Sequence, residues 1–150
     1  MYAAFYKSTR NGLPGTYNRV IRWWERGKYS HVELVFSDGI SGSSSYMDGG
    51  VRLKPIEYSA DRWDFIELPN YLEANARKWF ETHQGEPYDL LGNIRFVFDA
   101  LPDSKTAWFC SEAFAESIGL QDSWRYGPNL LASVLRSNIQ SNLYKVIYTK

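Results

Sequence analysis

The chain has a single cysteine, Cys110, and only two histidines, His31 and His83, among its 150 residues. One cysteine excludes an intramolecular disulfide and a zinc site built from several thiolates. The two histidines and the scattered carboxylates match no metal-ligand spacing, so we predict no metal site and no other cofactor. If Cys110 is a nucleophile, its base must therefore be one of two residues.

An excess of charge of one sign is also lacking, because 17 basic and 17 acidic side chains give a formal net charge of +0. This balance gives no reason to expect a nucleic acid as a partner. No apolar run approaches the roughly 18 residues that span a bilayer, and the N-terminus lacks the pattern of a signal peptide. We therefore expect no transmembrane segment and a soluble protein, cytoplasmic by default or associated with a phage or virion.

The chain shows no internal repeat and no linker-like segment, and its length suits a single domain over 1–150. Alternating apolar residues between turn signals predict strands over 2–6, 29–36, 40–46, 51–55, 63–68 and 143–148. Helical spacing predicts helices over 16–26, 71–83, 110–118 and 130–136, and an apolar run over 90–98 is compatible with another. Several neighbouring strands between 29 and 68 indicate an α+β fold on an antiparallel sheet packed with helices.

Cys110 stands at the start of the predicted helix 110–118. Free backbone N–H groups and the helix dipole favour the thiolate there, and the thiolate is the reactive form of cysteine. The common alternative for a lone cysteine is a buried small apolar residue. The polar neighbours Ser111 and Glu112 favour the reactive interpretation.

His31 lies within the predicted strand 29–36, where a period of two puts it on one face with Glu33. That face must be either solvent or a site. Glu33 is able to hold the imidazole in one tautomer, or to pair elsewhere. His83 ends a predicted helix, where the dipole favours a solvated histidine. We therefore expect His31, rather than His83, to meet Cys110.

Several short motifs follow one another in a characteristic order. A Gly-Glu-Pro-Tyr segment at 85–88 precedes Phe-Cys-Ser-Glu at 109–112, and the histidine strand at 30–35 comes earlier in the chain. This order resembles the circularly permuted NlpC-type papain-like amidases, the YaeF/YiiX group. Residues 48–52 and 126–130 are similar to the segments that follow the histidine hairpin and the cysteine helix in that group. The resemblance covers about residues 29 to 132.

The resemblance implies a papain-like fold in which Cys110 is the nucleophile and His31 the general base. It also implies that Tyr88 lies near the nucleophile and helps to position the substrate or the oxyanion. Backbone N–H groups at the start of the cysteine helix would supply part of the oxyanion hole.

The third polar residue of the family belongs on the strand after the histidine hairpin. Counting from His31 favours Ser43, and counting back from the glycines at 49–50 favours Ser45. Neither serine is a strong orienting group, and Glu33 is the alternative. The sequence thus leaves three candidates for the third polar residue.

The expected function is that of a cysteine hydrolase, an amidase or peptidase, which forms a thioester with a cell-wall peptide or a lipid-linked amide. Two other functions remain open. One is a weakly active or inactive binding module that keeps a papain-like cleft, and the other is a lipid acyltransferase, in which the acceptor is not water.

Overall fold

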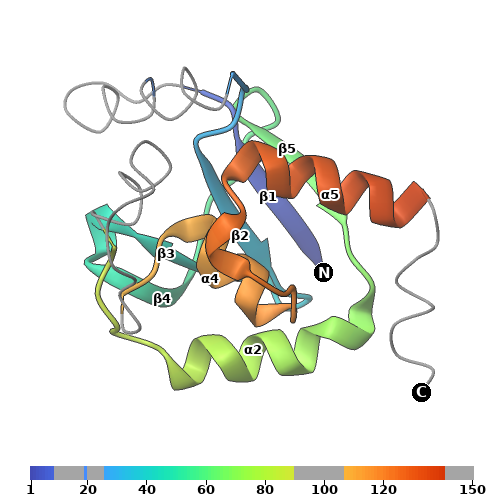
Figure 1. Cartoon of the computed structure of the whole chain (residues 1–150). Helices are drawn as coiled ribbons and strands as arrows, with labels where there is room; N and C mark the ends of the chain where they lie inside the picture. Colours follow the sequence, from blue (N-terminus) through green and yellow to red (C-terminus); the bar gives the residue numbers. More distant parts are fainter. Residues whose placement is uncertain (9–18, 20–25, 90–106, 141–150) are drawn as a thin grey trace.

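The computed structural model describes residues 1–8, 19, 26–89 and 107–140, and these form an α+β fold (Figure 1). The strands are β1 (Tyr2–Tyr6), β2 (His31–Val35), β3 (Ile40–Ser45), β4 (Gly50–Pro55) and β5 (Trp63–Glu67). The α-helices in the described ranges are α2 (Glu73–Thr82), α4 (Cys110–Ser117) and α5 (Pro128–Gln140). Short 3₁₀ helices cover Tyr46–Asp48, Asn70–Leu72 and Ser123–Arg125. The predicted α+β class and antiparallel sheet are confirmed.

The five strands predicted before residue 70 agree with β1 to β5 within two residues at each end, and the helices predicted over 71–83 and 110–118 agree equally well. The prediction for α5 was too short, because the helix already begins at Pro128. Proline suits the first helical position, where the missing N–H would have no acceptor. The segments 90–98 and 143–148 lie outside the described residues, as does 16–26 apart from residues 19 and 26. Among the described helices, none is long and apolar enough to cross a membrane.

The sheet has the strand order β4-β3-β2-β1-β5, and each neighbouring pair is antiparallel. β1 is an interior strand, because Ala3 pairs with Leu34 of β2 on one side and with Ile66 of β5 on the other. The ladder between β2 and β3 runs only through Leu34 and Val35. The end of β2 that carries His31 therefore lies beyond that ladder.

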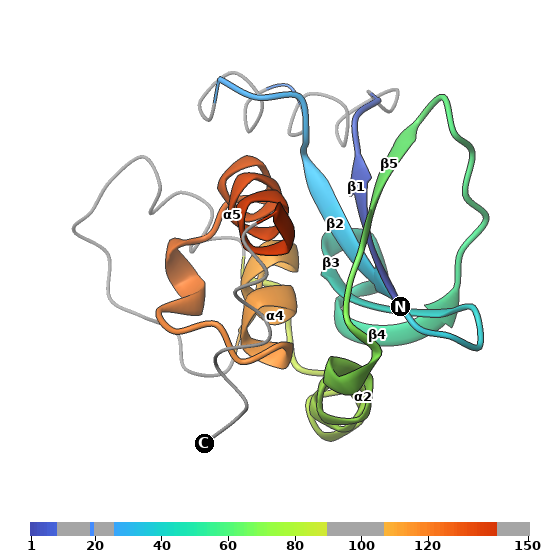
Figure 2. The same cartoon turned by 90° about the vertical axis from the view of Figure 1, so that its right-hand side faces the viewer.

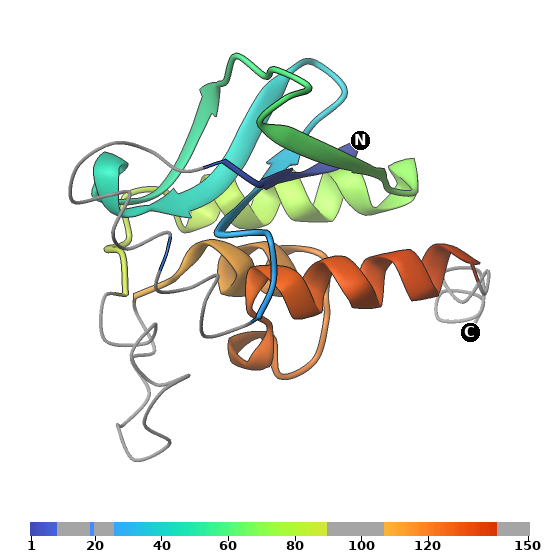
Figure 3. The same cartoon turned by 90° about the horizontal axis from the view of Figure 1, so that it is seen from above.

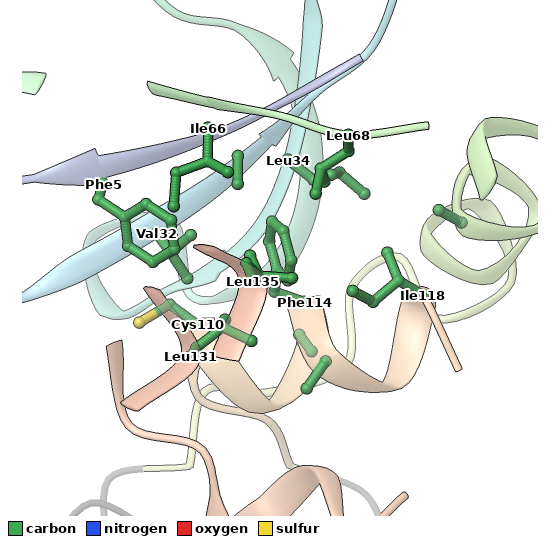
Figure 4. Close-up of a cluster of buried hydrophobic side chains, with 14 of the residues drawn as sticks. Phe5, Val32, Leu34, Ile66, Leu68, Cys110, Phe114, Ile118, Leu131 and Leu135 are labelled. Atoms are coloured by element: carbon green, nitrogen blue, oxygen red, sulfur yellow. The ribbon is translucent and has the colours of Figure 1, made fainter. Parts of the chain in front are cut away.

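The helices pack on one face of the sheet (Figure 2). α4 contacts β2 and β3, and it also contacts both α2 and α5, which run along its two sides (Figure 3). Burial of each large apolar side chain in this layer contributes about 1.5–3 kcal/mol. The core between sheet and helices includes Phe5, Val32, Leu34, Ile66, Phe114, Leu131 and Leu135 (Figure 4).

A smaller cluster occupies the other face of the sheet. It contains Ala4, Tyr6 and Trp63, with Val35 and Tyr58 packed against it. Its members in β1 and β2 alternate with residues of the main core, as the period of two requires. Both faces of the interior strands are thus covered, which explains how Glu33 of β2 becomes buried while His31, at the end of the strand, is half-buried.

Candidate active site

Cys110 is the first residue of α4 and is only 3% exposed. The residue before it, Phe109, is extended (φ −95°, ψ 165°), so the chain enters the helix directly at the cysteine. The Ala113 N–H makes a bond within the first turn, to Phe109 O at 3.0 Å. The sulfur lies at the margin of the main core and points away from Phe114 and Leu135 (Figure 4). Cys110 is thus buried, but its sulfur does not fill the core.

The segment leading to Cys110 is fixed to the sheet through Trp108. The Ser44 hydroxyl of β3 donates a hydrogen bond to Trp108 O at 2.6 Å. Trp108 also forms a parallel bridge with Tyr88, in which the Trp108 N–H donates to Pro87 O at 3.0 Å. These bonds hold the start of α4 beside the end of β2 that lies beyond the β2–β3 ladder.

The imidazole of His31 contacts both Cys110 and Glu33. His31 Nε2 is 2.8 Å from Glu33 Oε1, and Cys110 lies near enough to the ring to raise the pKa of His31. An ionised carboxylate only accepts hydrogen bonds, so Nε2 carries a proton and Nδ1 is the nitrogen left for the sulfur. The imidazole of His31 therefore lies between the sulfur of Cys110 and the carboxylate of Glu33.

The electrostatics of His31 favour its charged form. Burial alone would lower the pKa of His31, but the charge and hydrogen bond of Cys110, and then those of Glu33, raise it to about 9. The site therefore favours an imidazolium beside Cys110 and Glu33. Since the ordinary histidine pKa is about 6.5, the interactions of the charged ring stabilise the fold fully below pH 6.5. The contribution is lost as the pH rises through about 9.

We expect the imidazole of His31 to titrate with a pKa of about 9 in the wild-type protein. In Cys110→Ala the pKa should fall, because burial then opposes the imidazolium without the sulfur to offset it. NMR of the imidazole nitrogens measures both titrations, and the His83 resonances should be the same in the two proteins. A wild-type His31 pKa at or below 6.5 would contradict the pair.

Glu33 is buried, at 2% exposure, and is held by Arg52 of β4. Arg52 Nη1 donates to Glu33 Oε2 at 2.6 Å and Nη2 donates to Oε1 at 2.5 Å. Burial would raise the pKa of Glu33, but the bonds from Arg52 and His31 lower it to about 2. Glu33 is therefore a carboxylate at neutral pH, with its orientation set by a two-pronged bond.

Arg52 is itself anchored by a further carboxylate. Its Nε donates to Asp48 Oδ2 at 2.9 Å, and Asp48 also pairs with Lys54. Arg52 was not among the predicted site residues, although it ends the segment 48–52. The only signal in the sequence was a charged residue inside a predicted strand. In the structure Arg52 pairs with Ser43 of β3, the strand that lies between β4 and the β2 strand of Glu33.

The two serines considered for the third position bind elsewhere. Ser43 is buried, and its hydroxyl donates to Val32 O at 2.7 Å. Ser45 is half-buried at the end of β3, where it pairs with Gly50. No hydrogen bond from either serine to His31 occurs among the residues described. Glu33 is the group that lies against the imidazole.

Tyr88 and His83 lie near the segment that leads to the nucleophile, but in different ways. The half-buried Tyr88 is joined to Trp108, two residues before Cys110, and its ring lies 6.1 Å from that of Tyr46. His83 follows α2, with Nδ1 2.8 Å from Trp79 O and its ring stacked 4.1 Å from that of Trp79. The structure brings His31, and not His83, to Cys110.

Within the described ranges, no group of three or more histidine, cysteine or acidic side chains is placed to hold a metal ion. Comparisons with protein-family models, curated proteins and solved structures find no match for this chain. Its function must therefore be inferred from the residues and their geometry.

Proposed function

We propose that the protein is a cysteine hydrolase that cleaves amide bonds, with Cys110 as nucleophile, His31 as acid and base, and Glu33 as the residue that positions His31. One observation carries the proposal: Glu33 Oε1 lies 2.8 Å from His31 Nε2, while Cys110 lies near enough to the same ring to raise its pKa. A cysteine without a nearby base would be a structural residue. A cysteine that shares a proton with an oriented imidazole has the parts of an activated nucleophile.

In the first step the thiolate of Cys110 attacks the carbonyl carbon of the substrate. The negative charge that develops on the carbonyl oxygen is stabilised by backbone N–H groups in the first turn of α4, which have no intrahelical acceptor. The imidazolium of His31 gives its Nδ1 proton to the leaving nitrogen, the C–N bond breaks, and a thioester remains on Cys110.

In the second step water hydrolyses the thioester. Neutral His31 takes a proton from the water at Nδ1 while the oxygen attacks the acyl carbon. The C–S bond then breaks, the acid leaves, and the thiolate–imidazolium pair is restored. Glu33 remains ionised throughout and keeps the other proton on Nε2, so that Nδ1 faces the sulfur in both steps.

The papain-like, circularly permuted fold is part of this proposal. It is supported by a cysteine at the start of a helix that packs on an antiparallel sheet, with the histidine on a strand earlier in the chain. The half-buried Tyr88, joined to the segment before Cys110, suits the substrate-positioning role that the resemblance gives it. The proposed substrates are a cell-wall peptide or a lipid-linked amide.

Trapping of the acyl intermediate tests this function. We expect wild-type protein incubated with peptidoglycan fragments, or with acyl lipids that contain an amide, to gain an acyl group on Cys110 and to release an amine. Both should be absent in Cys110→Ala, and intact-mass and product mass spectrometry measure them. Release of the free acid identifies a hydrolase, and transfer to another lipid or amine identifies an acyltransferase. No adduct, together with slow alkylation of Cys110 by iodoacetamide, would identify a binding module instead.

A further inference from the structure

A cavity of about 610 Å³ lies between the residues that lead into β2 and the first turns of α5. Four of its lining residues are cations, namely Arg26, Lys28, Arg125 and Arg136. No acidic side chain is among the described residues that line it. Because the whole chain carries 17 basic and 17 acidic side chains, this is a local excess of positive charge. The volume is that of a pocket for a small molecule.

The nearest carboxylate does not cancel this charge. Asp64 accepts from Lys28 Nζ at 2.6 Å, but it also accepts from Lys7 Nζ at 2.7 Å. Asp64 also accepts from the Tyr29 hydroxyl at 2.7 Å, so one carboxylate is shared by two ammonium groups and a hydroxyl. Arg125 is 3.5 Å from Asp122, and both side chains are more than half exposed, so this pair is weak.

Arg136 is held over the cavity by a neutral group. Its Nη2 donates to the Tyr29 hydroxyl at 2.6 Å, and its guanidinium lies 5.6 Å from the centre of the Tyr29 ring. Neither Arg136 nor Arg26 has a carboxylate partner within the described part of the chain. A guanidinium has five N–H donors, so Arg136 keeps donors for a ligand while Tyr29 fixes its position.

The cavity is joined to the candidate active site through both of its walls. Asn129 of α5 accepts from Tyr29 N at 2.8 Å and donates to Tyr29 O at 2.9 Å. Tyr29 precedes His31 by two residues, about 7 Å of extended chain. On the other wall, Leu130 of α5 lines the cavity, and α5 contacts α4, which begins at Cys110.

We propose that this cavity binds a small chemical group with two or more negative charges, or a carboxylate at the end of an acyl chain, and that this group belongs to the substrate cleaved at Cys110. The binding follows from the cavity and its four cations; the assignment to the substrate rests on the proposed function. The positive end of the α5 dipole, at a first turn that lines the cavity, adds to the attraction.

Titration with inorganic pyrophosphate, and separately with citrate, tests the binding without any reaction. We expect saturable NMR shifts at the Lys28 and Leu130 amides, and a Kd about tenfold weaker in Arg136→Gln, which loses one charged donor. Lys78→Gln, which removes an exposed cation of α2 outside the cavity, should leave the Kd unchanged. No saturable shift with either anion, or an equal Kd in Arg136→Gln, would overturn the proposal.

Vesicles of phosphatidylcholine with phosphatidic acid, whose phosphate monoester is able to carry two negative charges, distinguish the source of a phosphate. Sedimentation that depends on Arg136 supports a lipid-borne phosphate, whereas binding of pyrophosphate alone supports a soluble one.

A matched pair of substrates tests the link to Cys110. The p-nitrophenyl esters of octanoic and suberic acid have eight-carbon acyl chains that differ in a terminal methyl or carboxylate. We expect Arg136→Gln to lower kcat/KM about tenfold for the suberate alone. If neither ester is hydrolysed, the proposed function fails while the pyrophosphate titration still decides the binding. If both are hydrolysed and Arg136→Gln changes neither rate, the substrate assignment is wrong.

Discussion

Replacing His31 by alanine is expected to lower amide hydrolysis by about 10²–10⁴-fold, the usual contribution of a positioned acid–base group. The variant should also lose fast alkylation of Cys110 by iodoacetamide at pH 6. At that pH the wild-type imidazole, with its pKa raised to about 9, is charged and lies beside Cys110. A neighbouring cation favours the reactive form of a cysteine, and His31→Ala lacks that cation. Alkylation that is quenched at a series of times, followed by intact-mass spectrometry, measures the rate.

His83→Ala is the matched control, because it removes the other histidine of the chain. His83 stacks on Trp79 at 4.1 Å and is bonded to the backbone of α2, so its loss should affect packing and leave the alkylation rate unchanged. Thermal unfolding of both variants shows whether each is folded. Fast alkylation in folded His31→Ala, or slow alkylation in folded His83→Ala, would show that His31 is not the base.

The parts of this site that depend on local spacing were predictable from the sequence. Alternation along one strand places His31 and Glu33 on the same face, and the structure has them 2.8 Å apart. The start of α4 at Cys110 was equally predictable, since the helical spacing begins there and φ of +77° at Gly119 suits its end. Each of these features requires knowledge of only a few neighbouring residues.

The parts that depend on strand order were not predictable. β1 lies between β2 and β5, although β5 follows it by more than fifty residues. Arg52 reaches Glu33 because β4 pairs with β3 and β3 with β2, and no spacing within β4 reveals that. The choice between Glu33, Ser43 and Ser45 depended on the same information, because Ser43 turns to Val32 O.

Replacing Glu33 by alanine is expected to destabilise the fold by about 3–5 kcal/mol, the cost of breaking a buried ion pair from one side. Glu33 is 2% exposed, and the Arg52 side chain bonded to both its oxygens is 11% exposed. The substitution leaves Arg52 without its buried carboxylate and His31 without the acceptor at Nε2. Urea denaturation at pH 7 measures the loss.

Glu33→Gln separates the charge of this residue from its shape. The amide oxygen is able to accept from Nε2, but the negative charge is gone, so the pKa of His31 should fall below about 9 and hydrolysis should decrease in the folded protein. The pKa of Glu33 is lowered from about 4.5 to about 2, so its charge stabilises the fold above pH 4.5. The stability difference between wild type and Glu33→Gln should therefore disappear as the pH falls through about 2.

The double variant Glu33→Gln/Arg52→Met removes both charges of the buried pair. We expect the double variant to lose less stability than the sum of the losses in the two single variants. The difference, a coupling of about 0.5–3 kcal/mol, arises because neither member of the pair is left as a buried charge without its partner. Ser43→Ala is a control on β3, where only the hydroxyl's bonds to the backbone oxygens of Val32 and Ser44 are lost. If the double variant recovers stability but not activity, Glu33 has a role in positioning His31 that is distinct from holding the sheet together. If Glu33→Gln hydrolyses its substrate at the wild-type rate, Glu33 contributes to stability alone.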